Sequence, residues 1–160
     1  MRRLGSETLV IATHNAGKLK EISALLAPFG MTLIAVRRQT RSERGVRIIP
    51  EEGISTALEQ ADHVVNILPD NASTLNYVNA RRLACIKPGA RFYNVGRGTT
   101  VDQGALLEAL RSGRLAGAYL DVFEVEPPGR TGQMLLQLTN FTVCAFFAVF
   151  VDDAQLVTRH

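Results

Sequence analysis

Residues 91–127 constrain the fold of this chain more than any other stretch. Phe92–Val95 is apolar and extended in character, and Leu115–Leu120 is apolar enough to be a buried strand. Between them, Ala105–Leu110 has helical character, and Gly113 ends the predicted helix. Three residues of types that favour helix N-caps precede this helix: Thr99, Thr100 and Asp102. This order of strand, turn, helix and strand predicts an α/β protein with a parallel sheet.

Three charged residues fall where the predicted strands end. Gly96 and Gly98 flank Arg97, so a guanidinium follows the first strand with no bulky neighbour in sequence. Asp121 directly follows the second strand, and Glu126 lies in the loop after it. In open α/β sheets, ligands bind beyond the carboxyl ends of the strands, which makes these residues candidates for a binding site.

The beginning of the chain predicts a second strand–helix–strand unit. Strands at Leu9–Ala12 and Met31–Val36 enclose a helix at Lys18–Ala27. Leu19, Ile22, Leu25 and Leu26 are spaced to share one face of that helix. We therefore expect a single-domain, doubly wound, mostly parallel Rossmann-like sheet in a three-layer αβα arrangement. Its first strand is central, and the further strands are predicted at Arg47–Ile49, His63–Leu68, Phe92–Val95, Leu115–Leu120 and Asn140–Cys144.

The segment NVGRGTTVDQGALLEALRSGRLAGAYLDVFEVEP closely resembles the cofactor-binding domain of the D-isomer-specific 2-hydroxyacid dehydrogenases, above all the glyoxylate/hydroxypyruvate reductase branch. The resemblance extends from about Gly53 to about Phe150. It implies that Arg97 binds the substrate carboxylate, that Glu126 orients a catalytic histidine, and that Asp121 holds the nicotinamide carboxamide. It also implies that Leu68, Pro69 and Thr74 lie under the adenine and its ribose.

The sequence departs from this family where the catalytic histidine belongs. Ala145 and Phe146 stand in place of the family's Pro-His pair, and phenylalanine has no ionisable group for proton transfer. The residues outside the cofactor-like part are too few for the family's substrate domain. The resemblance therefore implies an NAD(P)-binding domain with impaired catalysis.

The loop after the first strand lacks the G-x-G-x-x-G pattern of dinucleotide sites, because residues 12–17 read ATHNAG. TLVIATHNAGKLKEISALLAPFGMTLIA instead resembles the N-terminus of the inosine triphosphate pyrophosphatase family, which implies triphosphate contacts from Thr13, Asn15 and Lys18. A helix N-terminus with a lysine suits phosphate in either family. The alternative is that Thr13 or Asn15 only caps the helix and that Lys18 is solvated. The magnesium-binding D-D-S-G and the C-terminal S-H-R of the pyrophosphatases are absent from the sequence.

The two resemblances suggest a chimera with a seam at about residues 36–53, a segment that contains five arginines. An arginine after the second strand can accept the 2′-phosphate of NADP, and Arg38 is placed for that role. A solvated basic loop is the alternative, and a nucleic-acid site ranks last because no aromatic residues are interleaved.

Composition restricts the remaining possibilities. A net charge of +3 is too small to indicate nucleic acid by itself. Cys85 and Cys144 lie in apolar segments, which predicts buried, reduced thiols in a cytoplasmic protein. The most apolar run, Phe141–Val151, is too short to span a bilayer and is a candidate edge for homodimerisation. His63 is expected at the surface rather than as a ligand.

Together these observations predict a nucleotide-binding domain at residues 1–150 and a tail at residues 151–160. The predicted cofactor is NAD or NADP, with NADP favoured, and neither a metal nor a membrane is expected. Two other functions stay open: a pyrophosphatase acting on non-canonical purine nucleoside triphosphates, and an engineered or recombined chimera without activity of its own.

Overall fold

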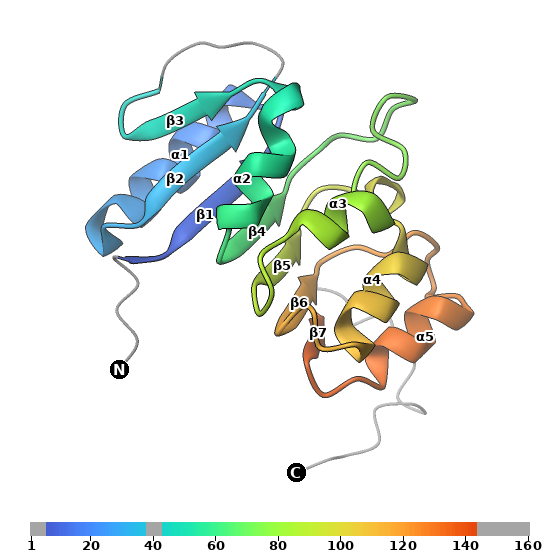
Figure 1. Cartoon of the computed structure of the whole chain (residues 1–160). Coiled ribbons are helices and arrows are strands. Elements are labelled where there is room, and N and C mark those ends of the chain that lie inside the picture. Colours follow the sequence, from blue (N-terminus) through green and yellow to red (C-terminus); the bar gives the residue numbers. More distant parts are fainter. Residues whose placement is uncertain (1–5, 38–42, 144–160) are drawn as a thin grey trace.

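The computed structural model describes residues 6–37 and 43–143, and these form one parallel sheet with helices on both faces (Figure 1). The strand order is β3-β2-β1-β4-β5-β6-β7, which confirms the predicted doubly wound, Rossmann-like sheet, with β1 an interior strand between β2 and β4. The strands are β1 (Thr8–Ala12), β2 (Thr32–Val36), β3 (Val46–Ile49), β4 (His63–Asn66), β5 (Arg91–Asn94), β6 (Gly117–Leu120) and β7 (Phe141–Val143).

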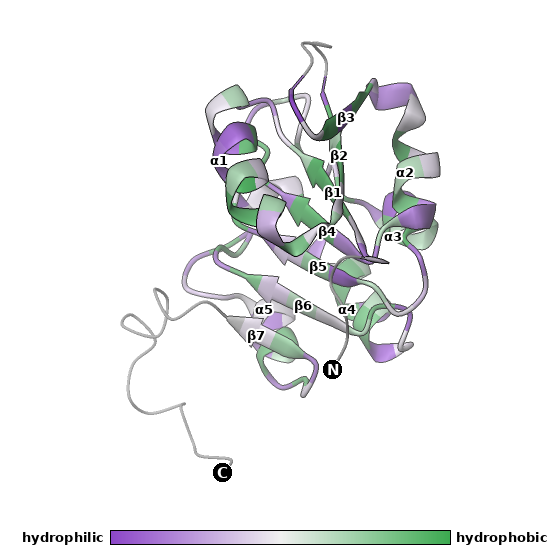
Figure 2. Cartoon of the chain, turned by 90° about the vertical axis from the view of Figure 1, so that its left-hand side faces the viewer, coloured by the Kyte–Doolittle hydropathy of each residue, from purple (hydrophilic) through white to green (hydrophobic). Residues whose placement is uncertain are grey.

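The helices divide between the two faces of the sheet (Figure 2). On one face, Leu19 of α1 packs against Leu9, Ile11 and Leu33. The other face carries the larger core, which holds Phe92 together with buried residues of α2 to α5. The α-helices are α1 (Ala16–Leu26), α2 (Ile54–Gln60), α3 (Ala80–Cys85), α4 (Gln103–Arg111) and α5 (Arg130–Leu136), and 3₁₀ turns are η2 (Ala27–Phe29), η3 (Glu51–Gly53) and η4 (Gly98–Thr100).

The structure differs from the sequence-based predictions at two helices, α1 and α5. Leu25 does not share the buried face of α1, because its side chain is 67% exposed while Leu19 is fully buried. The helix α5 was not predicted, and its Leu135 is buried in the same core as Phe123 and Phe141. No helix in the described part of the chain has the length and apolar character needed to cross a bilayer.

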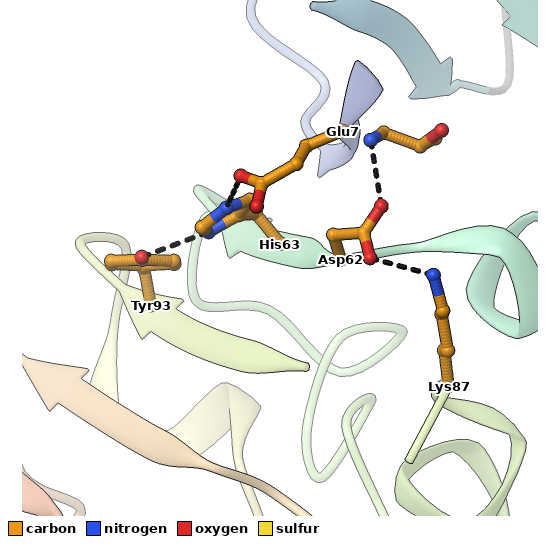
Figure 3. A network of polar contacts seen from close by, with 6 residues as sticks. Glu7, Asp62, His63, Lys87 and Tyr93 are labelled. Atoms are coloured by element: carbon orange, nitrogen blue, oxygen red, sulfur yellow. Dashed lines mark hydrogen bonds and ion pairs between the residues drawn. The ribbon is translucent and has the colours of Figure 1, made fainter. Parts of the chain in front are cut away.

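His63 was expected at the surface, and that expectation is wrong. Its ring lies between two partners at the amino end of β4, as Figure 3 shows. Nε2 lies 2.8 Å from Glu7 Oε2, and Nδ1 lies 3.0 Å from the Tyr93 hydroxyl. Tyr93 in turn stacks on Tyr119, with ring centroids 5.0 Å apart. Burial, together with the neighbouring Tyr119, raises the pKa of Tyr93 above its ordinary value.

Asp62 ties three segments together beside this histidine (Figure 3). Its Oδ2 accepts a hydrogen bond from the Thr8 N–H at 3.0 Å, and Lys87 Nζ lies 2.7 Å from Oδ1. Burial alone would raise the pKa of Asp62, but the hydrogen bonds from Lys87 and Thr8 outweigh it and hold the pKa below its ordinary value. A lowered pKa in the folded state means that the ionised carboxylate stabilises the fold.

We expect Asp62→Asn to lower the free energy of unfolding by about 0.5 kcal/mol near pH 7, since the lysine is half exposed and the amide still accepts from Thr8. The stabilisation is present above the ordinary carboxyl pKa and is lost as the pH falls through the lowered folded value. The difference between variant and wild type should therefore vanish in acid. Urea unfolding across this pH range measures it, with the exposed Asp70→Asn as control. A difference that persists in acid would contradict the ion pair.

Candidate functional site

All strands of the sheet are parallel, so their carboxyl ends lie along one edge of the molecule. The strand order reverses between β1 and β4, and ligands of doubly wound sheets bind at such a switch point. This edge brings Thr13 and Arg97 to the same side of the protein, after β1 and β5. The other sequence-predicted residues that follow strands here are Leu68 and Pro69 after β4 and Asp121 after β6.

The turn after β5 is closely packed on both sides of Arg97. A Cβ atom on Gly96 would lie 2.7 Å from the carbonyl oxygen of Leu68. A Cβ atom on Gly98 would overlap the carbonyl group of Phe123. The two glycines therefore let the loops after β4 and β6 approach the turn. Arg97 between them is exposed, and its Nη1 donates to the Gly96 carbonyl at 3.1 Å.

Asp121 and Glu126 occupy the loop after β6. The Asp121 N–H donates to the Asn94 carbonyl at 2.9 Å, which fixes the backbone of Asp121 beside β5, while its side chain is half-buried. Glu126 is exposed, and its Oε1 accepts from the Phe123 N–H at 3.3 Å. Ala145 and Phe146, where the resemblance expects Pro-His, lie outside the described residues, as does Cys144.

The three candidate phosphate contacts after β1 already have local partners. Thr13 is fully buried, and its Oγ1 accepts from the Asn15 N–H at 3.0 Å. Asn15 caps α1 by accepting from the Lys18 N–H at 3.1 Å. Lys18 Nζ pairs with Glu21 at 3.0 Å on the exposed helix surface. The structure therefore shows the helix cap that was the alternative to a phosphate site. Ala16 and Gly17 are exposed at the first turn of the helix.

The loop after β4 contributes one buried and one exposed candidate. Leu68 is only 2% exposed, whereas Pro69 faces solvent. Thr74 is fully buried and donates its hydroxyl to the Pro69 carbonyl at 2.6 Å, so it closes the loop. Leu68 lines a shallow depression at the carboxyl edge, and the other residues around it are Ala12, His14, Val36, Arg37, Glu51 and Tyr77.

Sequence reasoning missed Arg37, the residue that directly follows β2. It selected Arg38 for the NADP phosphate, and Arg38 lies outside the described residues. Arg37 is 8% exposed, its N–H donates to the Ile49 carbonyl at 3.1 Å, and its side chain lines the depression. Within the described part of the chain, its Nε has no hydrogen-bond partner. The available signal was a charged residue placed immediately after a buried apolar strand.

The parallel sheet, its switch point and the residues at its carboxyl edge define a Rossmann-like α/β domain of the dinucleotide-binding class. One family within this class matches the sequence. Residues 4–148 match the model of the D-isomer specific 2-hydroxyacid dehydrogenase NAD binding domain, so the chain belongs to this family.

Curated relatives and solved structures agree with this assignment. D-3-phosphoglycerate dehydrogenase of Bacillus subtilis is 39% identical over 68% of this chain and 21% of its own length. Glyoxylate reductase of Thermococcus onnurineus is 39% identical over 62% of the chain and 30% of its own length. The NADPH-dependent glyoxylate/hydroxypyruvate reductase of Sinorhizobium meliloti, solved with NADP and sulfate, superposes with a TM-score of 0.82 at 29% identity, covering 92% of this chain and 48% of that one.

The chain thus spans less than a third of the length of these curated relatives and about half of the solved one. The family match begins at residue 4, so it includes the segment that resembles the pyrophosphatases and continues across the suggested seam. The comparisons give no support to a separate origin for that segment.

Proposed function

We propose that this chain is the cofactor-binding domain of an oxidoreductase for small 2-hydroxy or 2-oxo acids, with NADP as the preferred nucleotide. The observation that carries the proposal is the exposed Arg97, held in a glycine-flanked turn at the carboxyl edge of a Rossmann-like sheet. A fixed guanidinium binds a carboxylate through two parallel hydrogen bonds, which suits a small acid substrate.

The residues along the edge fit the parts of a dinucleotide. Pro69 offers an exposed apolar surface for the adenine, beside the buried Leu68. The exposed first turn of α1 at Ala16 and Gly17 offers backbone N–H groups to the pyrophosphate. In this proposal, Asp121 accepts from the nicotinamide carboxamide. Thr13, Asn15 and Lys18 act on the pyrophosphate indirectly, because they shape and cap this helix start.

Arg37 supports the preference for NADP. Its buried Nε lacks a hydrogen-bond partner among the described residues, and a buried charged donor gains from meeting an anion. A 2′-phosphate at the end of β2 would supply that anion. Solved relatives that carry NADP or NADPH include the Sinorhizobium reductase and a Xanthobacter autotrophicus dehydrogenase. Arg38 is the second candidate for the same phosphate.

Catalysis by this chain alone is expected to be impaired. When bound, the nicotinamide cofactor supplies or accepts the hydride, and a proton must move at the substrate oxygen at the same time. In this proposal Glu126 would orient a proton carrier, but Phe146 stands where the resemblance expects the histidine. Arg97 would then bind the acid without turnover.

The cofactor proposal is tested by titrating NADPH and NADH against Arg37→Met, which keeps the aliphatic part of the side chain. Loss of the charged bonds to one phosphate should weaken NADPH binding by about 10- to 100-fold while NADH binding changes little. Arg47→Ala, on the exposed side of β3, is the matched control and should bind both cofactors as wild type does.

Three results are informative. Saturable NADPH binding without glyoxylate-dependent oxidation supports the proposal as stated. Glyoxylate-dependent oxidation of NADPH that Arg97→Ala abolishes would show intact catalysis and contradict the impairment. A wild-type protein that binds neither nucleotide at millimolar concentration would contradict the assignment of the site.

A further inference from the structure

Three polar side chains are buried behind the turn that carries Arg97. Asn66 ends β4, Asn94 ends β5 and Thr100 lies in η4, and each is fully buried. The two asparagines follow Val64 and Phe92 at a spacing of two residues, so they face the same side of the sheet as the main core. Apolar side chains would fit this buried face of the sheet, so the buried asparagines call for a specific explanation.

Hydrogen bonds join these side chains to the backbone around Arg97. Asn66 Nδ2 donates to Asn94 Oδ1 at 3.0 Å and to Thr100 Oγ1 at 2.7 Å. The Thr100 hydroxyl donates to the Arg97 carbonyl at 2.6 Å, and Asn94 Nδ2 donates to the same carbonyl at 3.1 Å. Asn94 Oδ1 also accepts from the Gly96 N–H at 3.2 Å. The network therefore holds backbone groups both before and after the α-carbon of Arg97.

The guanidinium is connected to the same network. Arg97 Nη1 donates to the Gly96 carbonyl, and the N–H of Gly96 is held by Asn94. The arrangement carries a stability cost, because Asn66 Oδ1 is buried without a hydrogen-bond partner in the described part of the chain. A chain selected only for stability would not need this unsatisfied group.

We propose that Asn66, Asn94 and Thr100 are positioning residues for Arg97, and that they hold its backbone so that the guanidinium presents one orientation to a carboxylate. The proposal rests on the proposed role of Arg97 as the carboxylate-binding residue. It adds a reason for burying polar side chains at the ends of β4 and β5. Displacement of a binding group by about 1 Å can reduce its effect about 100-fold. Hydrogen bonds that fix the Arg97 turn from its buried side therefore affect binding.

The test compares three threonine variants in oxamate titrations followed by the side-chain Nε–H resonance of Arg97. Thr100→Val keeps the shape and removes both hydroxyl bonds, and we expect it to weaken oxamate binding by about tenfold or more. Thr100→Ser restores the hydroxyl and should bind within about threefold of wild type. Thr99→Val is the matched control, since Thr99 Oγ1 has no hydrogen-bond partner among the described residues.

Equal oxamate affinity in Thr100→Val and wild type, with only a lower melting temperature, would show a purely structural role and overturn the proposal. Should Thr100→Val fail to fold, backbone relaxation of the wild type decides the question. An Arg97 amide order parameter near 0.85 supports a held turn, and a value below about 0.6 overturns it. A wild type that does not bind oxamate also overturns it, whereas failure of NADPH binding alone contradicts only the cofactor proposal.

Discussion

A Gly98→Ala variant is expected to lose about 3 kcal/mol or more of its free energy of unfolding. The added Cβ would overlap the carbonyl group of Phe123 and lie 2.5 Å from the Glu124 nitrogen. Both obstacles are backbone atoms, so no side-chain rotation relieves the overlap. The loop after β6 would have to move away from the turn, and Asp121 and Glu126 would move with it. Urea unfolding at equilibrium measures the loss.

Gly129→Ala is the matched control for this experiment. Its Cβ would meet no atom within 4 Å, and its φ of −68° is open to any residue. The control should therefore stay within about 0.5 kcal/mol of wild type. Wild-type stability in Gly98→Ala would mean that the two loops do not approach as closely as described, and the compact site at the carboxyl edge would lose its basis.

The second large effect is expected for Arg97. Replacing it by alanine removes a charged, two-pronged donor from an exposed turn, and we expect oxamate binding to weaken at least 100-fold, which corresponds to about 3 kcal/mol. Stability should change little, because the side chain makes a single described hydrogen bond, to its neighbour Gly96. Arg97→Lys keeps the charge but not the planar fork, and it should recover only part of the affinity.

Arg111→Ala controls for the loss of a positive charge. Arg111 is exposed in the last turn of α4 and pairs with Glu108 at 3.7 Å. Its removal should leave oxamate binding unchanged. If Arg97→Ala and Arg111→Ala weakened oxamate equally, the binding would reflect net charge rather than a specific carboxylate site.

The arrangement of the sheet followed from sequence because its determinants are local. Apolar runs such as Leu9–Ala12 and residues 92–95 lie between strong turn and cap residues, and parallel pairing with crossover helices then leaves few topologies. Asn15, Asn79 and Asp102 each cap a helix through their side chains, as residues of their types commonly do. The helix α5 was missed because its sequence, RTGQMLL, contains a glycine and no strong periodic pattern.

The long-range polar contacts, at the site and elsewhere, were harder to predict, since they join residues far apart in sequence. Glu7 and His63 are separated by 56 positions, and Asn66 and Thr100 by 34. The burial of Arg37 depends on the approach of η3 and the loop after β4, which no local pattern encodes. The roles of Arg97, Asp121 and Glu126 came from the family resemblance, and they stay predictions.

In the proposed function, a nicotinamide dinucleotide binds along the carboxyl edge of the sheet. Amide chemical shifts recorded during an NADPH titration test it most directly, because glycines mark both edges. Binding at this edge should give saturable shifts for Gly17 at the start of α1 and for Gly96 in the Arg97 turn, with Gly89 and Gly117 at the amino edge unchanged. Shifts confined to Gly89 and Gly117, or no shifts at millimolar NADPH, would contradict it.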